Sequence, residues 1–409
     1  AETCSPVPSI DAFRLILGSM TKEYELSTTD FDTAFLQSFV WGDGRLMLIK
    51  YWDIFEEKGV YEWISGVIYG DQRGGCDWHK TLSYRMAQEL GFKECYNMDS
   101  IYYHKDKDIT VPCHVDDPLV KAKPDDQKWF HENINNMFDT KGCNYLRPGS
   151  DLEYLSMRIS TNEAGDIMLD NQLKIEKYLN DMGLTECNPT QEPIHKDWVK
   201  KIHDEQVKEM LVDEDQVKEF QRILGDAQWL AQTTHPTLAV ACSVYASMGK
   251  KVVPSSLAAL KHMFRYLKGS KKRCLVKKAD NTDGLVVSSD SDWAGMYTLT
   301  GEVRSRTGSF ITYNGMPIAW KSSYQQCKGT NYTEEEDLIA TSSAEAETYG
   351  AHDTVKLGLH ITNVGEEVNI PIQRPMKVGV DAAAAIGFIN NTGTVSRMKH
   401  LDLREAWVQ

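Results

Sequence analysis

The stretch ITVPCHVDDPLV, from Ile109 to Val120, places two adjacent carboxylates between two apolar runs. The apolar runs have the length and composition of strands, and the polar residues between them are typical of a hairpin turn. Burying an acidic pair in an apolar hairpin is costly unless a cation compensates its charge. Carboxylate oxygens suit Mg²⁺, which binds one or two carboxylates together with substrate phosphates. The stretch therefore predicts a hairpin that presents Asp116 and Asp117 to a divalent cation, with an ordinary polar turn as the alternative.

A third acid is needed if this hairpin is to hold two metal ions, which typically stand about 3.5–4 Å apart. The candidate is Asp30, which ends an apolar strand in TTDFDTAFLQ. Two metals on Asp30, Asp116 and Asp117 would activate a primer hydroxyl and stabilise the leaving pyrophosphate. That reaction is phosphoryl transfer by positioning and charge neutralisation.

The secondary-structure pattern divides the chain into three blocks. Strands and helices alternate up to residue 195. In this block LEYLSMRIS is expected to form one strand, and the amphipathic DWHKTLSYRMAQELGF, with Trp78 on its apolar side, ends at Gly91, a predicted C-cap. Residues 195–268 have a nearly continuous helical pattern, interrupted at Pro236 and Pro254. Strand patterns return from Gly284 onward. We therefore expect domain boundaries near residues 195 and 280.

The composition is that of a globular chain, with 41% hydrophobic and 25% charged residues among 409, enough for two or three domains. No apolar run reaches the roughly 18 residues that a transmembrane helix needs. The start, AETCSPVPSI, lacks a Met and has neither part of a signal peptide, so we expect a processed or incomplete product that is not secreted. The nine cysteines are odd in number and show no CxxC spacing, which argues against disulfides or zinc. A reducing intracellular compartment, a cytoplasmic particle or the nucleus, is predicted.

The charge distribution leaves two interpretations open. The net charge of -14 argues against nucleic-acid binding when it is taken alone. The segment from Lys250 to Ala279, however, carries ten Lys and Arg residues and no acid. This basic run is either a solvated helix face or a surface that meets phosphates.

A series of motifs then relates the chain to a known family. They run from ETCSPVPSIDAFRLIL at the start to SRMKHLDLREAWV at the end. Between them lie DFDTAFL, IYG…W, HVDD, FDTKGCNYL, TTHPTLAVA, FRYLKGS, SDSDWAG, SRTGSFITYNGMPIAWKS and SSAEAETYGA. In this order, over nearly its whole length, the chain resembles the reverse transcriptase–ribonuclease H region of copia-type LTR retrotransposon Pol polyproteins.

The resemblance implies a multidomain α+β and α/β fold. Residues 1–195 would form a right-hand polymerase palm with largely truncated fingers, and residues 196–280 a helical thumb or connection region that includes the basic run. Residues 281–409 would form a ribonuclease H-like domain. The implied activity is RNA-directed DNA polymerase with ribonuclease H, with two Mg²⁺ or Mn²⁺ ions per site. The implied partners are an RNA template, a DNA primer, their RNA–DNA heteroduplex and dNTPs.

The resemblance also assigns residues in the polymerase palm. Asp30 takes the place of the first-strand aspartate, and Asp116 and Asp117 that of the paired aspartates on the hairpin. Phe35 falls on the position that packs against the sugar and excludes a 2′-hydroxyl, although a core aromatic is the alternative. Arg73 is a candidate for contact with a nucleotide phosphate.

A second set of acids belongs to the ribonuclease H motifs. By resemblance, four residues take the catalytic and metal-binding positions: Asp290, Glu347, Asp381 and Asp402. Two metals held there would clamp a scissile phosphate between the attacking water and the leaving oxygen. Asp292 and Glu345 fall in the same motifs and are interpreted as supporting or surface groups. His400 is adjacent and is either an aid to proton transfer or a packing or surface residue.

Four features depart from the family pattern. The usual Leu-Lys-Gln-Ala-Pro run after Tyr69-Gly70 is replaced by Asp71–Gly75, and the chain starts after the basic strands of the fingers. His114 replaces the usual Tyr, and Pro118 follows the acidic pair, so an irregular second hairpin strand is expected. CKGTNYTEEEDL is an insertion. These features keep two other functions open: a domesticated or truncated, catalytically silent copy that is a structural subunit of a larger assembly, and a chain with only ribonuclease H activity.

Overall fold

The computed structural model describes residues 5–39, 47–53, 55–64, 66–325 and 339–390, and it divides into two compact units. Unit 1 comprises Ala1–Leu155, Ser160–Gly165 and Asn363–Pro371, and unit 2 comprises Ser156–Ile159, Asp166–Thr362 and Ile372–Gln409. The fold is a mixed α+β arrangement with several sheets, as predicted. Every helix in the described part of the chain is too short or too polar to cross a membrane.

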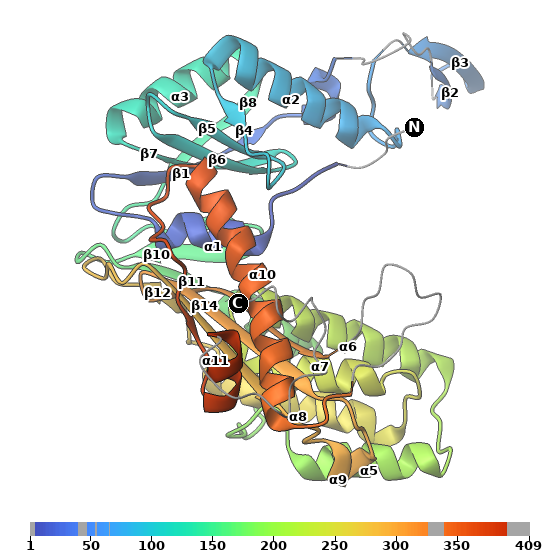
Figure 1. Ribbon diagram of the computed structural model, residues 1–409. Coiled ribbons are helices and arrows are strands. Elements are labelled where there is room, and N and C mark those ends of the chain that lie inside the picture. Colours follow the sequence, from blue (N-terminus) through green and yellow to red (C-terminus); the bar gives the residue numbers. More distant parts are fainter. Residues whose placement is uncertain (1–4, 40–46, 54, 65, 326–338, 391–409) are drawn as a thin grey trace, which may run out of the picture. The chain divides into compact units, whose positions relative to one another are not determined.

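Unit 1 is built on a six-stranded sheet with the order β4-β5-β6-β7-β1-β8. Its strands are β1 (Glu25–Phe31), β4 (Lys93–Glu94), β5 (Ile101–His104), β6 (Ile109–His114), β7 (Asp117–Ala122) and β8 (Thr140–Tyr145). Its helices are α1 (Ile10–Gly18), the 3-10 helix η1 (Ala34–Gln37), α2 (Gly74–Leu90) and α3 (Pro124–Met137). Helices α2 and α3 lie on the same face of the sheet (Figure 1), and they bury Trp78, Leu82, Phe130 and Ile134 against it. This core fixes the β6–β7 hairpin in place.

Local sequence signals account for the ends of these helices. The Ser9 Oγ accepts a hydrogen bond from the Ala12 N–H, 3.2 Å away, which satisfies a free donor at the start of α1. Gly91 follows α2 with a φ of 78°, in the left-handed region where glycine is favoured. The predicted helix and its C-cap at Gly91 are therefore confirmed.

The β6–β7 hairpin is continuous through its proline. Cys113 pairs with Pro118 and His114 with Asp117 in one unbroken register. The predicted irregularity at Pro118 is therefore wrong. Pro118 is the second residue of β7, and near the start of a strand the missing N–H removes little of the ladder.

Three further sequence segments form short strands. β2 (Met47–Asp53) and β3 (Lys58–Ile64) pair as an antiparallel sheet of their own. LEYLSMRIS, expected to be one strand, is divided into β9 (Leu152–Tyr154) and β10 (Met157–Thr161). The intervening Leu155 and Ser156 both have positive φ, 51° and 58°, which is typical of a tight turn between strands.

Unit 2 contains the helical block that the sequence predicts. Its elements are α4 (Gln172–Asp181), α5 (Lys196–Val207), α6 (Glu214–Thr233), the 3-10 helix η2 (Pro236–Leu238), α7 (Ala239–Met248) and α8 (Pro254–Ser270). Pro236 and Pro254 open η2 and α8, where a missing N–H interrupts no helical bond. The helices share one apolar core that includes Phe220, Leu260 and Phe264.

The other half of unit 2 is a four-stranded sheet with the order β15-β14-β13-β16. Its strands are β13 (Leu285–Asp292), β14 (Arg306–Tyr313), β15 (Met316–Tyr324) and β16 (Val378–Gly379). β11 (Ile167–Asp170) and β12 (Leu275–Lys277) pair with each other in antiparallel register. This part of the chain also contains helices α9 (Tyr297–Thr300), α10 (Ser343–Glu367) and α11 (Ala383–Ile389). The Trp320 Nε1 donates to the Ala231 carbonyl at 2.6 Å, so the sheet is joined directly to α6.

Candidate metal centres

The first group of predicted acids lies where β1, β6 and β7 meet. β1 pairs with β7 in an antiparallel register in which Thr28 faces Leu119. Continuing this register by two residues puts Asp30 opposite Asp117, and directly opposite residues project from the same face. The Phe31 N–H donates to the Asp116 carbonyl at 3.1 Å, which ties the end of β1 to the hairpin turn.

The turn that carries the acidic pair has an unusual backbone conformation. Val115 has a φ of 59°, which is uncommon for a β-branched residue and stores local strain. The Trp78 Nε1 donates to the Val115 carbonyl at 2.7 Å, and Trp78 itself is fully buried in α2. The turn is thus held from α2, so that the position of Asp116 and Asp117 depends on the core beneath the sheet.

The charges of this group interact, but the carboxylates are not gathered into one cluster. Asp116 is half-buried and Asp117 is exposed at the turn, so the pair is not enclosed in the hairpin. Partial desolvation raises the pKa of Asp117, and the neighbouring charges of Asp116 and Asp30 raise it further. The Asp30 carboxylate instead pairs with Lys141 on β8, with the Nζ and Oδ2 atoms 2.7 Å apart. The hydrogen bond to Asp30 raises the pKa of Lys141. In this arrangement the protein's own Lys141 compensates part of the acidic charge.

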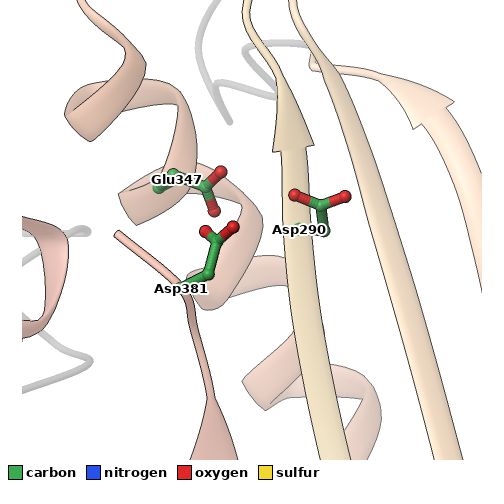
Figure 2. A group of neighbouring side chains, drawn as sticks. All are labelled: Asp290, Glu347 and Asp381. Carbon is green, nitrogen blue, oxygen red and sulfur yellow. The ribbon is translucent and has the colours of Figure 1, made fainter. Parts of the chain in front are cut away.

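The second group of acids is more tightly assembled. Figure 2 shows Asp290, Glu347 and Asp381 converging from β13, from α10 and from the segment after β16. Their ligand oxygens all lie within 4.8 Å of one another, and no other group of three such residues in the described part of the chain meets this condition. β16 runs parallel to β13 with Ser288 beside Gly379, so Asp290 and Asp381, each two residues further on, reach the same end of the sheet. The structure therefore brings together three of the four predicted acids.

Glu347 is the buried member of this cluster. Its Oε1 accepts a hydrogen bond from the Ser291 N–H at 3.1 Å, while its Oε2 is buried and has no hydrogen-bond partner among the described residues. Burial, followed by the charges of Asp381 and Asp290, raises the pKa of Glu347 to about 7. Three carboxylates, one with an unsatisfied buried oxygen, form a donor set that suits a hard divalent cation.

The other residues predicted near this cluster have separate positions. Asp292 is exposed at the end of β13. Glu345 is buried and accepts hydrogen bonds from Thr341 and from the Tyr349 hydroxyl, so it fixes the start of α10. The fourth predicted acid, Asp402, and His400 lie outside the described residues.

The two residues predicted to contact the nucleotide are both in contact with other side chains. The half-buried Phe35 in η1 has its ring centroid 5.1 Å from that of Tyr69. The Arg73 guanidinium, at the start of α2, lies 3.8 Å from the buried Asp77 carboxylate. Arg73 therefore carries a charge that is already compensated within unit 1.

Part of the basic run is likewise used inside the protein. Lys271 pairs with Glu176 at 2.8 Å and Lys278 pairs with Asp166 at 2.9 Å. The Lys268 Nζ donates to the Cys187 carbonyl at 2.7 Å. The two ion pairs reduce the positive charge that the run can offer to phosphates, because each acid neutralises its lysine locally.

Two contacts made by the acidic group and its hairpin were not predicted from the sequence. Lys141 falls in the FDTKGCNYL motif, but its partner Asp30 is 111 residues away in the chain. Trp78 was expected only to lie on the apolar face of a helix, whereas its indole N–H also holds the turn of the acidic hairpin. Both contacts depend on which strands and helices become neighbours, and the local patterns contain no signal for that.

Comparisons with known proteins agree with the resemblance. Residues 1–196 match the family described as reverse transcriptase (RNA-dependent DNA polymerase). The chain is similar to the Retrovirus-related Pol polyprotein from transposon TNT 1-94 of Nicotiana tabacum, with 23% identity over 100% of this chain and 30% of that protein. It is similar to the corresponding polyprotein from transposon RE1 of Arabidopsis thaliana, with 25% identity over 98% of this chain and 26% of that protein. A transposon Ty5-1 protein of Saccharomyces cerevisiae is 24% identical over 80% of this chain and 99% of its own length.

The family match assigns residues 1–196 to the class of reverse transcriptases. The chain belongs to the copia-type retrotransposon Pol polyproteins and contains their reverse transcriptase domain. It spans less than a third of the length of the tobacco and Arabidopsis polyproteins.

Proposed function

We propose that the chain is an RNA-directed DNA polymerase with an attached ribonuclease H of a copia-type retrotransposon. Residues 1–195 act as the palm, residues 196–280 as the thumb or connection region, and residues 281–409 as the ribonuclease H-like domain. The observation that carries the proposal is the convergence of Asp290, Glu347 and Asp381 in a chain whose first 196 residues match the reverse transcriptase family.

At the polymerase site, Asp30, Asp116 and Asp117 would hold the divalent ions, Mg²⁺ or Mn²⁺. When bound, such ions supply Lewis-acid activation of the primer hydroxyl and neutralise charge on the leaving group. The rigid turn at Val115 fixes the two hairpin carboxylates, because catalysis by positioning needs a site that is formed in advance. Phe35 lines the sugar position, and Lys141 neutralises Asp30 until a stronger cation replaces it.

At the ribonuclease H site, Asp290, Glu347 and Asp381, with Asp402 as the fourth acid, would hold two ions of the same kind. Bound there, they would activate a water molecule and stabilise the leaving oxygen of the RNA strand. With a pKa of about 7, the Glu347 carboxyl is only partly ionised at neutral pH. It would release its proton when the cation binds, because ligands must be deprotonated.

The ligands that the proposed enzyme would bind are an RNA template, a DNA primer, their heteroduplex and dNTPs. A duplex of this kind is held mainly through its backbone and A-form shape. Members of the basic run without an ion pair among the described residues, such as Lys250, Lys251 and Lys272, are the ones available for that contact. The place of action would be a reducing intracellular compartment.

The direct test is primer extension on an RNA template with dNTPs and Mg²⁺. Asp117→Asn should lower extension by about 100-fold or more, because it removes a carboxylate that would hold the metal ion whose charge stabilises the transition state. The matched control is Asp106→Asn, which changes an exposed acid in the turn between β5 and β6 and should leave extension unchanged. Absence of extension in the unmodified chain, with either metal, would reject the polymerase assignment.

A second function is favoured by the internal compensation of charge. Lys141 pairs with Asp30, and Arg73 pairs with Asp77, as expected if the polymerase site no longer met metal or nucleotide. The chain would then be a silent copy that is a structural subunit of a larger assembly. The same primer-extension assay separates the two functions. A chain that keeps only ribonuclease H activity would cleave the RNA strand without extending the primer.

A further inference from the structure

The β2–β3 hairpin carries an aromatic face that none of the assigned roles explains. Leu48 lies opposite Trp63, Lys50 opposite Tyr61, and Trp52 opposite Gly59. Because opposite and alternate residues share one face of an antiparallel pair, these six residues form a single surface. Trp52, Tyr61 and Trp63 are 64%, 59% and 66% exposed. We call this surface the aromatic face.

The chemistry of the aromatic face suits nucleotide bases. Its three rings are planar, and Tyr61 and Trp63 stand two residues apart on β3, a spacing of roughly 6.6–6.8 Å. That is about twice the 3.4 Å rise of one strand of a nucleic acid. The Lys50 Nζ lies 5.5 Å from the centroid of the Tyr61 ring, so a cation is set among the rings.

Charge distinguishes this face from the rest of the protein. The face contains no acid, whereas the chain as a whole has a net charge of -14. Glu62, the neighbouring acid on β3, projects from the opposite side of the hairpin. Aromatic rings combined with positive charge are the usual composition of surfaces that bind single-stranded nucleic acid without reading its sequence.

We propose that the aromatic face binds the single-stranded part of the RNA template, with bases stacked on Trp52, Tyr61 and Trp63 and a phosphate near Lys50. The proposal rests on the proposed polymerase function and names a surface for its template. Stacking is sequence-tolerant because every base has a π-face. The surface would therefore accept any unpaired template segment and discriminate against fully paired duplex.

The test measures the affinity of the full chain for a labelled, unstructured RNA of about 12 nucleotides, a typical site size, by fluorescence anisotropy. It uses no metal and no dNTP. The double variant Trp52→Ala/Trp63→Ala should weaken binding by about 10-fold or more, because each base–aromatic stack contributes substantially. The control Tyr51→Ala/Val60→Ala changes the opposite face of the same hairpin and should bind as the unmodified chain does.

Two further variants separate stacking from folding and from charge. Trp52→Phe/Trp63→Phe keeps aromatic rings and should restore most of the affinity. Lys50→Gln should lower the slope of log affinity against log salt by about 0.7, while the double alanine variant should leave that slope unchanged. A slope that falls in the ring variant, or no rescue by phenylalanine, would contradict stacking.

Unchanged RNA affinity in Trp52→Ala/Trp63→Ala would overturn the proposal. Unchanged RNA affinity with a shift in oligomeric state would also overturn it and assign the face to a second copy of the chain. Asp117→Asn should bind this RNA normally, because the aromatic face contains no catalytic acid. Failure of primer extension alone would thus be distinguishable from failure of RNA binding.

Discussion

Glu347 is buried beside two other carboxylates, and its pKa of about 7 lies above the ordinary value of 4.5. Between these two values the folded chain binds more protons than the unfolded chain, so stability falls as pH rises through this window. The protein therefore keeps an acid that destabilises it at neutral pH. A group retained at such a cost is typical of a functional site.

Replacing this acid should reveal that cost. Glu347→Gln keeps an acceptor for the Ser291 N–H and removes the charge. Its free energy of unfolding should equal that of the unmodified chain near pH 4 and exceed it by about 1–2 kcal/mol at pH 8, after allowing for solvent screening. Urea denaturation at both pH values measures the difference. Glu345→Gln, two residues away and outside the carboxylate cluster, is the control and should show no gain at high pH.

Lys141 is the residue whose role the sequence did not reveal. It neutralises Asp30 and so competes with any cation at that site. Lys141→Gln should therefore lower the Mn²⁺ concentration needed for half-maximal primer extension. Lys128→Gln, which removes an exposed lysine of α3, should leave it unchanged. A higher metal requirement in Lys141→Gln would show instead that Lys141 contributes to substrate binding.

At the scale of elements, the β6–β7 hairpin depends on a helix to hold its strained turn. Trp78→Phe removes the hydrogen bond to the Val115 carbonyl and part of a buried ring. The expected loss of stability is about 1–3 kcal/mol, from an unsatisfied carbonyl and a small cavity together. Primer extension should decline with it, because the acidic pair loses its support. Trp129→Phe, on a half-buried residue of α3, is the control; equal losses in both variants would argue against a specific role for Trp78.

Element prediction from the sequence succeeded where the signal is local. The two apolar runs within Ile109–Val120 and the glycine after α2 both indicated the observed structure. The prediction failed where the backbone conformation of single residues determines where a strand ends. Leu155 and Ser156 adopt positive φ and divide one expected strand into two, and neither residue type signals such a turn.

At the scale of the whole molecule, the candidate sites depend on pairing over long distances. The sequence identified the acids by type and motif, and strand register brings Asp290 and Asp381 to one end of the sheet. It could not predict that Lys141 would reach Asp30, since β8 and β1 become neighbours only in the folded sheet. The expected division near residue 280 stays a prediction, while contacts such as Trp320 with Ala231 place the helices and the sheet in one compact unit.

We propose that one chain contains two independent sites for phosphoryl chemistry. The most direct measurement follows both reactions on one substrate, a labelled RNA template annealed to a DNA primer, with dNTPs and Mg²⁺. If the two sites are independent, Asp116→Asn abolishes extension and spares RNA cleavage, whereas Asp290→Asn abolishes cleavage and spares extension. Loss of both activities in either variant, or neither activity in the unmodified chain with any metal, would contradict it.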